Sequence, residues 1–140
     1  MQAHEVHKKG ADVFTRHDIE AFADLYAADA VVNDPGYPEP LKGREAVKKD
    51  MAVFVTAFPD IQVRVVNSIA AGNNMIAAEW VMTGTNRGPI ETPTGTIPAT
   101  NKRIELRVGT FERLNGEGRI VEESRYYDQA GLFAQLGVSP

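Results

Sequence analysis

The chain contains no cysteine. That absence excludes a disulfide framework, a catalytic thiolate and a zinc site with cysteine ligands. Long hydrophobic runs are also missing, because no stretch approaches the roughly 18 apolar residues of a membrane span. Residues 1–9 are polar and have no apolar core of the kind found in signal peptides. We therefore expect a soluble, cytoplasmic protein with no membrane partner.

Basic residues are too few and too scattered to form a nucleic-acid-binding surface. The chain has 15 Lys and Arg against 19 Asp and Glu, which gives a formal net charge of -4. The cationic patches Lys8-Lys9 and Lys48-Lys49 both lie on expected helices. Because binding to DNA or RNA requires clustered Lys and Arg, a nucleic-acid partner is not expected.

Metal-ligating residues are equally sparse. Among the three histidines, His4, His7 and His17, the first two stand at i, i+3 spacing on one helix. No third or fourth ligand is near them in sequence, so a solvated helix face is favoured over a metal site. Glycine-rich phosphate loops and nucleophile elbows are missing as well. We expect neither a metal nor a cofactor.

The length of 140 residues fits one domain, residues 1–140. At this size about two-thirds of the surface of the unfolded chain can be buried on folding. The 43% hydrophobic content is enough to build a core without covalent cross-links. A small internal pocket is compatible with that core.

Helix signals dominate the first 58 residues. Two consecutive helices are expected at the start, the second with Asp18 as its N-cap ahead of an apolar stripe at helical spacing. Residues 30–34 predict a short strand that the Pro35-Gly36 turn ends. A third helix is expected over residues 44–58, where apolar residues recur with the 3.6-residue period.

Strand signals dominate the second half of the chain. Four strands are expected, at residues 61–70, 75–85, 104–114 and 119–127. Residues 86–102 contain Pro and Gly among threonines and predict a long loop or a frayed hairpin. A short helix is expected over residues 130–136, before a natural C-cap at Gly137. Helices followed by antiparallel-type strands predict an α+β domain, with the helices on one face of the sheet.

The other face of this sheet also carries apolar residues. In the strand over residues 104–114, Leu106 and Val108 alternate with Gly109 and Phe111, so neither face is wholly polar. We expect a second copy of the chain to cover the exposed face, which predicts a homodimer through the sheet.

Local sequence motifs point to a family, in addition to the order of helices and strands. They resemble the SnoaL-like polyketide cyclases of the nuclear transport factor 2-like superfamily, which are related to the ketosteroid isomerases. The resemblance covers residues 5–137, apart from the loop at 89–100. It implies a cone-shaped, curved antiparallel sheet and about three N-terminal helices that enclose an apolar pocket. The motifs that carry the resemblance lie at residues 18–35, 58–61, 83–85, 119–123, 126–128 and 135–137.

The resemblance implies proton transfer on an apolar carbonyl compound, which needs a carboxylate base and a donor to the enolate oxygen. Asp34 matches the base of the ketosteroid isomerases, although an aspartate here could equally cap the turn at Pro35-Gly36. The two oxyanion donors of those isomerases correspond to Gly10 and Gly109, which have no donor side chain. Ordinary ketosteroid isomerisation is therefore not expected.

Arg125 stands where the SnoaL-like cyclases have an acid/base aspartate, and Gly109 stands where they have a histidine. Because a guanidinium stays charged near neutral pH, Arg125 indicates anion binding or a salt bridge with Glu123 or Glu105, not aldol chemistry. Strand alternation places Tyr127 on the same face as Arg125, so its hydroxyl can donate a hydrogen bond into the pocket.

Further residues are expected to contact the ligand. Arg107 would add positive charge to the floor of the cavity if it faces inward with Arg125, and an interstrand ion pair is the alternative. Asp128 is either an acid catalyst or the N-cap of the last helix. The expected aromatic contacts are Tyr26, Phe54, Trp80 and Phe111.

These features predict a cofactor-free enzyme that isomerises, cyclises or hydrates a hydrophobic carbonyl compound, with Asp34, Tyr127 and Arg125 as catalytic residues. The alternative is a non-catalytic module for ligand binding or dimerisation, which the glycines at positions 10 and 109 favour. An epoxide hydrolase would need an Asp-Arg-Asp relay, which the sequence alone does not assemble. A buried carboxylate would indicate catalysis, whereas a uniformly apolar pocket would indicate binding.

Overall fold

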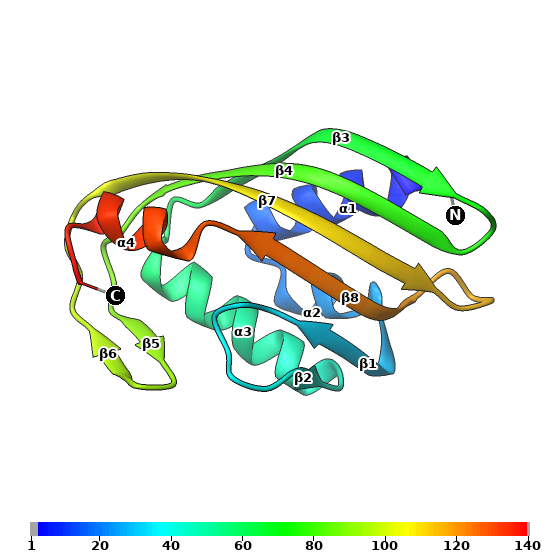
Figure 1. Cartoon of the computed structure of the whole chain (residues 1–140), viewed down its shortest axis with the longest axis horizontal. Coiled ribbons are helices and arrows are strands. Elements are labelled where there is room, and N and C mark those ends of the chain that lie inside the picture. Colours follow the sequence, from blue (N-terminus) through cyan, green and yellow to red (C-terminus); the bar gives the residue numbers. More distant parts are fainter. Residues whose placement is uncertain (1–2, 140) are drawn as a thin grey trace.

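A curved six-stranded sheet with helices on one side is the main feature of the computed structural model, which describes residues 3–139 (Figure 1). Within these residues three helices precede most of the sheet and a fourth follows it, so the expected α+β class is confirmed. The helices are α1 (Ala3–Thr15), α2 (Ile19–Ala23), α3 (Arg44–Ala57) and α4 (Gln129–Leu136). The strands are β1 (Tyr26–Asn33), β2 (Leu41–Lys42), β3 (Gln62–Ala71), β4 (Met75–Thr85), β5 (Ile90–Thr92), β6 (Gly95–Ile97), β7 (Arg103–Leu114) and β8 (Ile120–Tyr127).

The strand order in the main sheet is β2-β1-β8-β7-β4-β3. From β3 to β8 the strands are antiparallel neighbours, as the sequence predicts. The exception to the antiparallel arrangement is β1, which pairs parallel with β8. This pairing is possible because α3 and the whole β3–β7 segment separate the two strands in sequence, and such a long connection lets the chain return in the same direction. It brings the end of β1 beside the end of β8.

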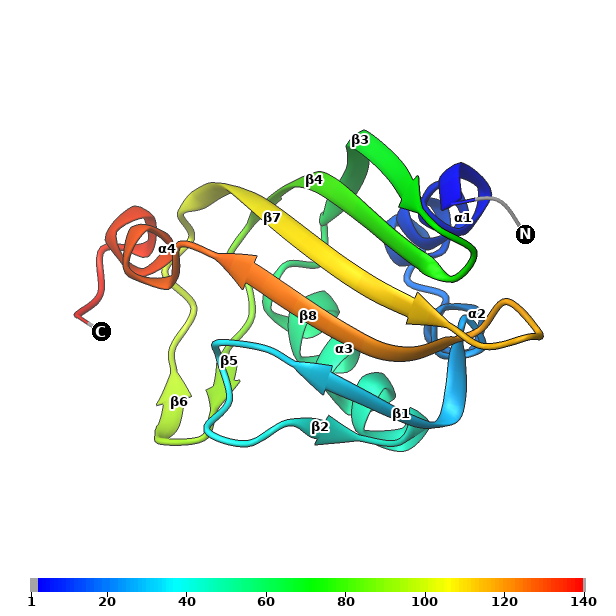
Figure 2. The same ribbon diagram turned by 45° about the vertical axis from the view of Figure 1, so that its right-hand side comes forward.

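The helices α1 and α3 cover the inner face of the sheet, as Figure 2 shows from a second direction. Buried residues of α1 recur at i, i+3, i+4 and i+7, so one side of this helix faces the sheet. The core has two apolar clusters, which leave a cavity where they meet. The clusters include Val6, Tyr26, Val32, Val47 and Ile120 in one and Phe58, Ile61, Ile104, Leu106 and Leu136 in the other.

Helix ends follow the capping signals of the sequence. The side chain of Asp18 accepts a hydrogen bond from the backbone N–H of Ala21 at 3.1 Å and caps α2. Asp128 caps α4 in the same way, through the N–H of Gly131 at 2.8 Å. Gly137 ends α4 with φ of 74°, a left-handed conformation that favours glycine. The predictions of Asp18 and Gly137 as caps are confirmed.

Residues 86–102 form the separate hairpin of β5 and β6 between two irregular segments. Asn86, which is fully buried, fixes the base of this hairpin. Its side-chain amide donates to the carbonyls of Ala57 and Gly88 at 3.1 and 2.9 Å, and its Oδ1 accepts from the N–H of Thr100 at 2.8 Å. The hairpin is thereby held against the end of α3.

The outer face of the sheet has no helical cover in Figures 1 and 2. Large apolar side chains are exposed on this side, among them Ile69, Phe111 and Tyr126. Phe111 and Tyr126 contact each other edge to face, with ring centroids 6.1 Å apart. None of the helices in residues 3–139 has the length and hydropathy that crossing a membrane requires.

Candidate functional site

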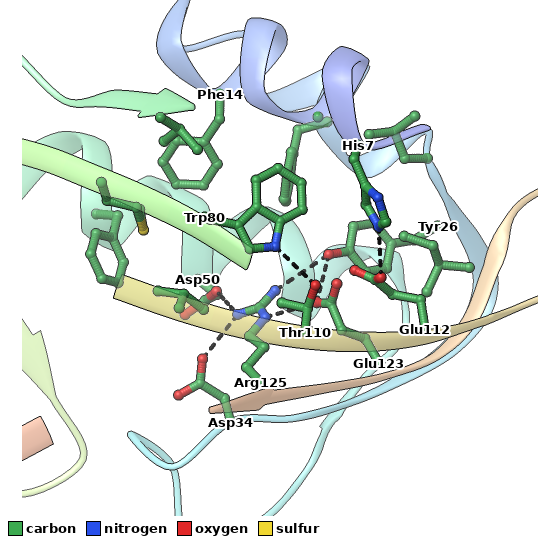
Figure 3. Close-up of a pocket in the computed structure, with 18 of the residues that line it drawn as sticks. His7, Phe14, Tyr26, Asp34, Asp50, Trp80, Thr110, Glu112, Glu123 and Arg125 are labelled. Carbon is green, nitrogen blue, oxygen red and sulfur yellow. Dashed lines mark hydrogen bonds and ion pairs between the residues drawn. The ribbon is translucent and has the colours of Figure 1, made fainter. Parts of the chain in front are cut away.

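A cavity of about 100 Å³ lies between the helices and the inner face of the sheet (Figure 3). A cavity of this size can take a small apolar group of a ligand. The ring N–H of Trp80 does not point freely into the cavity, because it donates to Oγ1 of Thr110 at 2.9 Å. The apolar walls consist of Val6, Phe14, Phe22, Leu25, Phe54, Trp80, Met82, Leu106 and Val108.

A larger groove of about 660 Å³ adjoins the cavity. It is bounded by the loop 34–38, the C-terminal half of α3, the β5–β6 hairpin and α4. The groove and the cavity share four lining residues, which form the neck between them: Asp34, Asp50, Phe54 and Tyr127.

Arg125 bridges two aspartates at this neck. Its Nη1 lies 3.0 Å from Oδ2 of Asp34 and 2.7 Å from Oδ2 of Asp50. Asp34 follows β1, Asp50 lies on α3 and Arg125 lies on β8, so three separate parts of the chain meet here. The three side chains are 6%, 10% and 12% exposed, respectively. The pocket therefore combines apolar walls with a desolvated group of charges.

Two tyrosines complete the surroundings of the aspartates. The hydroxyl of Tyr127 donates to Oδ1 of Asp34 at 2.8 Å, and that of Tyr37 donates to Oδ1 of Asp50 at 2.7 Å. Burial and the adjacent carboxylates raise the pKa of both phenols well above their usual range, so both keep their protons. The N–H of Gly36 is a third donor to Asp34, at 2.7 Å.

The two aspartates differ in how many of their lone pairs are occupied. A carboxylate has about four acceptor sites. Asp34 accepts three hydrogen bonds, from Arg125, Tyr127 and Gly36, whereas Asp50 accepts two. Asp50 therefore has more capacity left to accept a proton or a hydrogen bond from a ligand.

A second polar cluster lies deeper in the cavity wall. Glu112 on β7 and Glu123 on β8 are direct cross-strand partners, with exposures of 1% and 3%. Arg125 Nε and the hydroxyl of Tyr26 donate to Oε1 of Glu123 at 2.8 and 2.7 Å. On the other side, Nε2 of His7 lies 3.0 Å from Oε1 of Glu112. The side chains of these residues are shown together in Figure 3.

Burial dominates the protonation of this second cluster. It raises the pKa of Glu123 to about 8, with the Arg125 charge opposing and Glu112 reinforcing the shift. It also raises the pKa of Glu112 and lowers the pKa of His7 to about 4. His7 is therefore neutral near pH 7, and its Nδ1 lies 2.6 Å from the hydroxyl oxygen of Ser68.

Neither cluster has the composition of a metal centre. In the part of the chain that the structure describes, no three His, Asp or Glu side chains form a group that could hold a metal ion.

The model of the SnoaL-like polyketide cyclase family matches residues 4–136, nearly the whole chain. The protein belongs to this family. Membership places this SnoaL-like protein among proteins of the cyclase and isomerase type. The resemblance predicted from the sequence motifs is confirmed.

Solved structures share the SnoaL-like fold of this chain. A protein of ketosteroid isomerase-like fold from Catenulispora acidiphila has a TM-score of 0.79 at 22% identity, over 99% of this chain and 96% of that one. IdmH of Streptomyces antibioticus, a proposed polyketide cyclase, has 0.77 at 27%, over 99% and 100%. SalBIII, an epoxide hydrolase/cyclase-like enzyme of salinomycin pyran-ring formation, has 0.73 at 18%, over 91% and 92%. No curated protein matches the sequence significantly.

Most of the residues expected at the site of this SnoaL-like protein do line the cavity. Asp34 caps the turn, because Oδ1 accepts from the N–H of Gly36, and it also lines the cavity, where Oδ2 faces Arg125. Arg125 pairs with Glu123, one of its two expected partners, and also with the two aspartates. The expected residues that line the cavity are Tyr26, Asp34, Phe54, Trp80, Arg125 and Tyr127.

Three expected ligand contacts lie elsewhere. Arg107 and Phe111 point to the outer face of β7, because the inward positions of that strand are the even-numbered ones. Arg107 is 63% exposed and lies 3.6 Å from Glu79, so the interstrand ion pair is correct and the positively charged floor is wrong. Phe111 is 54% exposed on the same face. Asp128 is the cap of α4 and does not line the cavity.

Four polar residues of the site are not predicted from the sequence, and Glu123 is predicted only as a partner of Arg125, although each carries a signal. His7 was assigned to a solvated helix face, yet it shares the buried side of α1 with Gly10. Asp50 lies on the apolar stripe of α3, one turn before Phe54. The others are Tyr37 in the loop after Asp34, and Glu112 and Glu123, which have the inward parity of Val108 and Arg125.

Proposed function

We propose that this protein is a cofactor-independent acid/base enzyme that isomerises, cyclises or hydrates a hydrophobic small molecule with a carbonyl group. The observation that carries the proposal is the desolvated Asp34–Arg125–Asp50 bridge at the neck between the apolar cavity and the groove. A ligand that reaches from the groove into the cavity must pass these carboxylates. The non-catalytic alternative predicts a uniformly apolar pocket, which does not fit these charges.

In the proposed reaction an aspartate at the neck takes a proton from the substrate or from water. Asp34 is the first candidate for this base, and Asp50 adds a second carboxylate with more free acceptor capacity. Arg125 holds both carboxylates in place and stabilises negative charge that develops near them. Tyr127 and Tyr37 orient the carboxylates through their hydroxyl groups.

A second candidate reaction is the opening of an epoxide by water or by a hydroxyl group of the substrate. The specific observation in its favour is the Asp-Arg-Asp arrangement expected of such an enzyme, which the fold assembles from three segments. The epoxide hydrolase/cyclase-like SalBIII has the same fold. Both candidate reactions use a carboxylate at the neck as the base.

Turnover by aspartate variants tests the proposal. The probes are a panel of β,γ-unsaturated cyclic ketones, followed by absorbance of the conjugated product, and a panel of terpene and aryl epoxides, followed by diol formation. Loss of the general base should lower the rate by about 10²-fold to 10⁴-fold in Asp34→Asn or Asp50→Asn. Asp29→Asn, an exposed change on β1, is the matched control.

Binding distinguishes catalysis from a simple binding module. Trp80 is the single tryptophan of the chain and lines the cavity, so quenching of its fluorescence reports ligand entry. Ligand entry without turnover in the wild type, unchanged in Asp34→Asn and Asp50→Asn, would support the non-catalytic module and overturn the enzymatic proposal.

We also propose that the outer face of the sheet binds a second copy of this chain. The exposed residues Phe111 and Tyr126 form its apolar centre. The pairs Arg107 with Glu79 and Arg113 with Glu122 lie around it. An apolar centre with a rim of both charge signs can match a copy of itself across a two-fold axis.

A further inference from the structure

Two glutamates face each other in the interior, beyond the Asp34–Arg125–Asp50 bridge. Glu112 and Glu123 stand opposite one another in the antiparallel register of β7 and β8, and both are almost completely buried, with exposures of 1% and 3%. The charge of Glu112 helps to raise the pKa of Glu123. Two ionised carboxylates are unfavourable as cross-strand neighbours in a dry interior, because like charges repel and both have lost their hydration. One proton is therefore shared by the pair.

The hydrogen-bond partners of Glu112 and Glu123 are compatible with one shared proton. Tyr26 from β1 and Arg125 from β8 both donate to Oε1 of Glu123, so neither of these donors occupies Oε2. From α1, the neutral ring of His7 approaches Oε1 of Glu112. With the proton on Nε2, His7 donates to an ionised Glu112 and accepts from Ser68. The shared proton then lies on the side of Glu123.

The charge balance of the whole interior also favours a retained proton. Beyond the guanidinium of Arg125, Asp34 and Asp50 are the next charged groups. Among the described residues, Arg125 and His7 are the basic side chains that contact the four carboxyl groups. Because His7 is neutral, a single positive charge faces all four acids, and full ionisation would leave a large uncompensated negative charge away from water.

We propose that the Glu112–Glu123 pair is the acid of the reaction and gives its shared proton to the substrate oxygen. Both glutamates line the cavity. A ligand that has passed the neck therefore has this proton donor at its inner end and the carboxylates of Asp34 and Asp50 at its outer end. The inference rests on the proposed function and adds the source of the second proton. Acid and base are separated here by environment, with a buried carboxyl pair for one role and an arginine-bound aspartate for the other.

The proton balance closes for both candidate substrates. With a carbonyl compound, the pair protonates the carbonyl oxygen while an aspartate at the neck removes a proton from the adjacent carbon, which gives an enol. The pair then takes back the oxygen proton, and the aspartate returns its proton at the new carbon position. With an epoxide, the pair protonates the ring oxygen as its C–O bond breaks, the aspartate takes a proton from the attacking water or hydroxyl, and solvent carries that proton back to the glutamates.

Infrared spectroscopy of the resting protein tests the stored proton without a substrate. The wild type at pH 7 should show the carbonyl band of a protonated carboxylic acid, with a downward shift in heavy water. The band should disappear in Glu123→Gln and in Glu112→Gln. It should persist in Glu122→Gln, a change at the outward-facing neighbour on the same strand, which pairs with Arg113. Absence of the band in the wild type at pH 7 would overturn the inference.

Carbon NMR of the wild type with labelled glutamate carboxyl groups covers the case in which a variant does not fold. One glutamate at the β7–β8 contact should titrate near pH 8, and the inference fails if both titrate in the ordinary acidic range.

Turnover of the ketone and epoxide panels then tests the acid role itself. Glu123→Gln and Glu112→Gln should each lose about 10²-fold or more in rate, while Glu122→Gln keeps the wild-type rate. Unchanged turnover in the first two variants, together with the expected loss in Asp34→Asn or Asp50→Asn, would overturn the acid role and leave the proposed function standing.

Discussion

Asp50 on α3 and Arg125 on β8 form an ion pair of 2.7 Å that links the helical layer to the sheet. The same guanidinium also contacts Asp34 and Glu123, so one cation is shared by three acidic groups. Because Asp34 and Asp50 are buried, both depend on Arg125 for most of their charge compensation. The residue that organises the candidate site therefore also holds the two layers of the fold together.

Replacement of Arg125 by methionine should destabilise the protein strongly. Removal of one partner from a buried ion pair costs about 3–5 kcal/mol, because the remaining charges stay buried without compensation. The free energy of unfolding, measured by urea denaturation, should fall by about this amount. Arg107→Met is the control, since Arg107 forms an exposed pair with Glu79 that contributes about 0–1 kcal/mol. Equal effects of the two changes would contradict the buried role of Arg125.

Stability should fall as the pH rises from about 6.5 to 8. Glu123 has a folded pKa of about 8 against an ordinary 4.5, so its contribution is complete below pH 4.5 and is lost as the pH rises through 8. His7 has a folded pKa of about 4 against an ordinary 6.5, so its contribution is complete above pH 6.5 and is lost as the pH falls through 4. The two effects oppose each other below pH 6.5, and the loss from Glu123 alone remains above it.

The size of this loss is at most about 2 kcal/mol, from about 1.4 kcal/mol per pH unit for one proton. Urea denaturation of the wild type at pH 6.5 and at pH 8 measures it. Glu123→Gln should show a nearly flat profile over the same interval, and Glu122→Gln should follow the wild type. A wild-type stability that rises from pH 6.5 to 8 would show that Glu123 is ionised in the folded state.

Local rules predicted much of the fold and part of the site. Helix periodicity, the caps at Asp18 and Gly137 and the strand signals depend on neighbours in sequence, and the structure confirms them. Strand alternation likewise placed Arg125 and Tyr127 on one face. Such patterns act over a few residues and need no knowledge of the tertiary fold.

The contacts that define the site depend on tertiary pairing, which the sequence does not display. Asp34 reaches Arg125 because β1 pairs parallel with β8, a contact across 91 positions of the chain. The error at Arg107 has a similar origin, because alternation separates the two faces of β7 without showing which one is inside. The burial of His7 and Asp50 is equally hard to predict, because buried polar residues contradict the rule that polar side chains face water.

Phe111→Glu should weaken the proposed homodimer. The substitution places a charge at the apolar centre of the outer sheet face, where a charge without a partner opposes association. Light scattering coupled to size-exclusion chromatography should show a dimer for the wild type and a monomer for this variant. The fold should be retained, since Phe111 is 54% exposed and faces away from the core. Lys9→Glu, on the exposed side of α1, is the control and should leave the mass unchanged. A monomeric wild type would refute the dimer.

Gly10→Ala should stabilise the protein and reduce ligand binding at the same time. A Cβ at Gly10 would lie 3.5 Å from Cη2 of Trp80 and 3.7 Å from Cδ1 of Leu25, which are ordinary contacts, so the methyl group fits at the wall of the cavity. Alanine in place of glycine inside a helix contributes about 0.5–1 kcal/mol to stability. Because the methyl group occupies space in a cavity of about 100 Å³, hydrophobic ketones should quench Trp80 less at a given concentration.

Lys9→Ala separates this effect from a general change in α1, because Lys9 is on the exposed side of the helix beside Gly10. It should change the free energy of unfolding by less than about 0.5 kcal/mol, and it should leave the quenching curve unchanged. If Gly10→Ala raised stability and left ketone binding at the wild-type level, the ligand would have to bind outside the inner cavity. The groove beside the β5–β6 hairpin would then be the whole of the binding site, and the reacting group would meet Asp34 and Asp50 from that side alone.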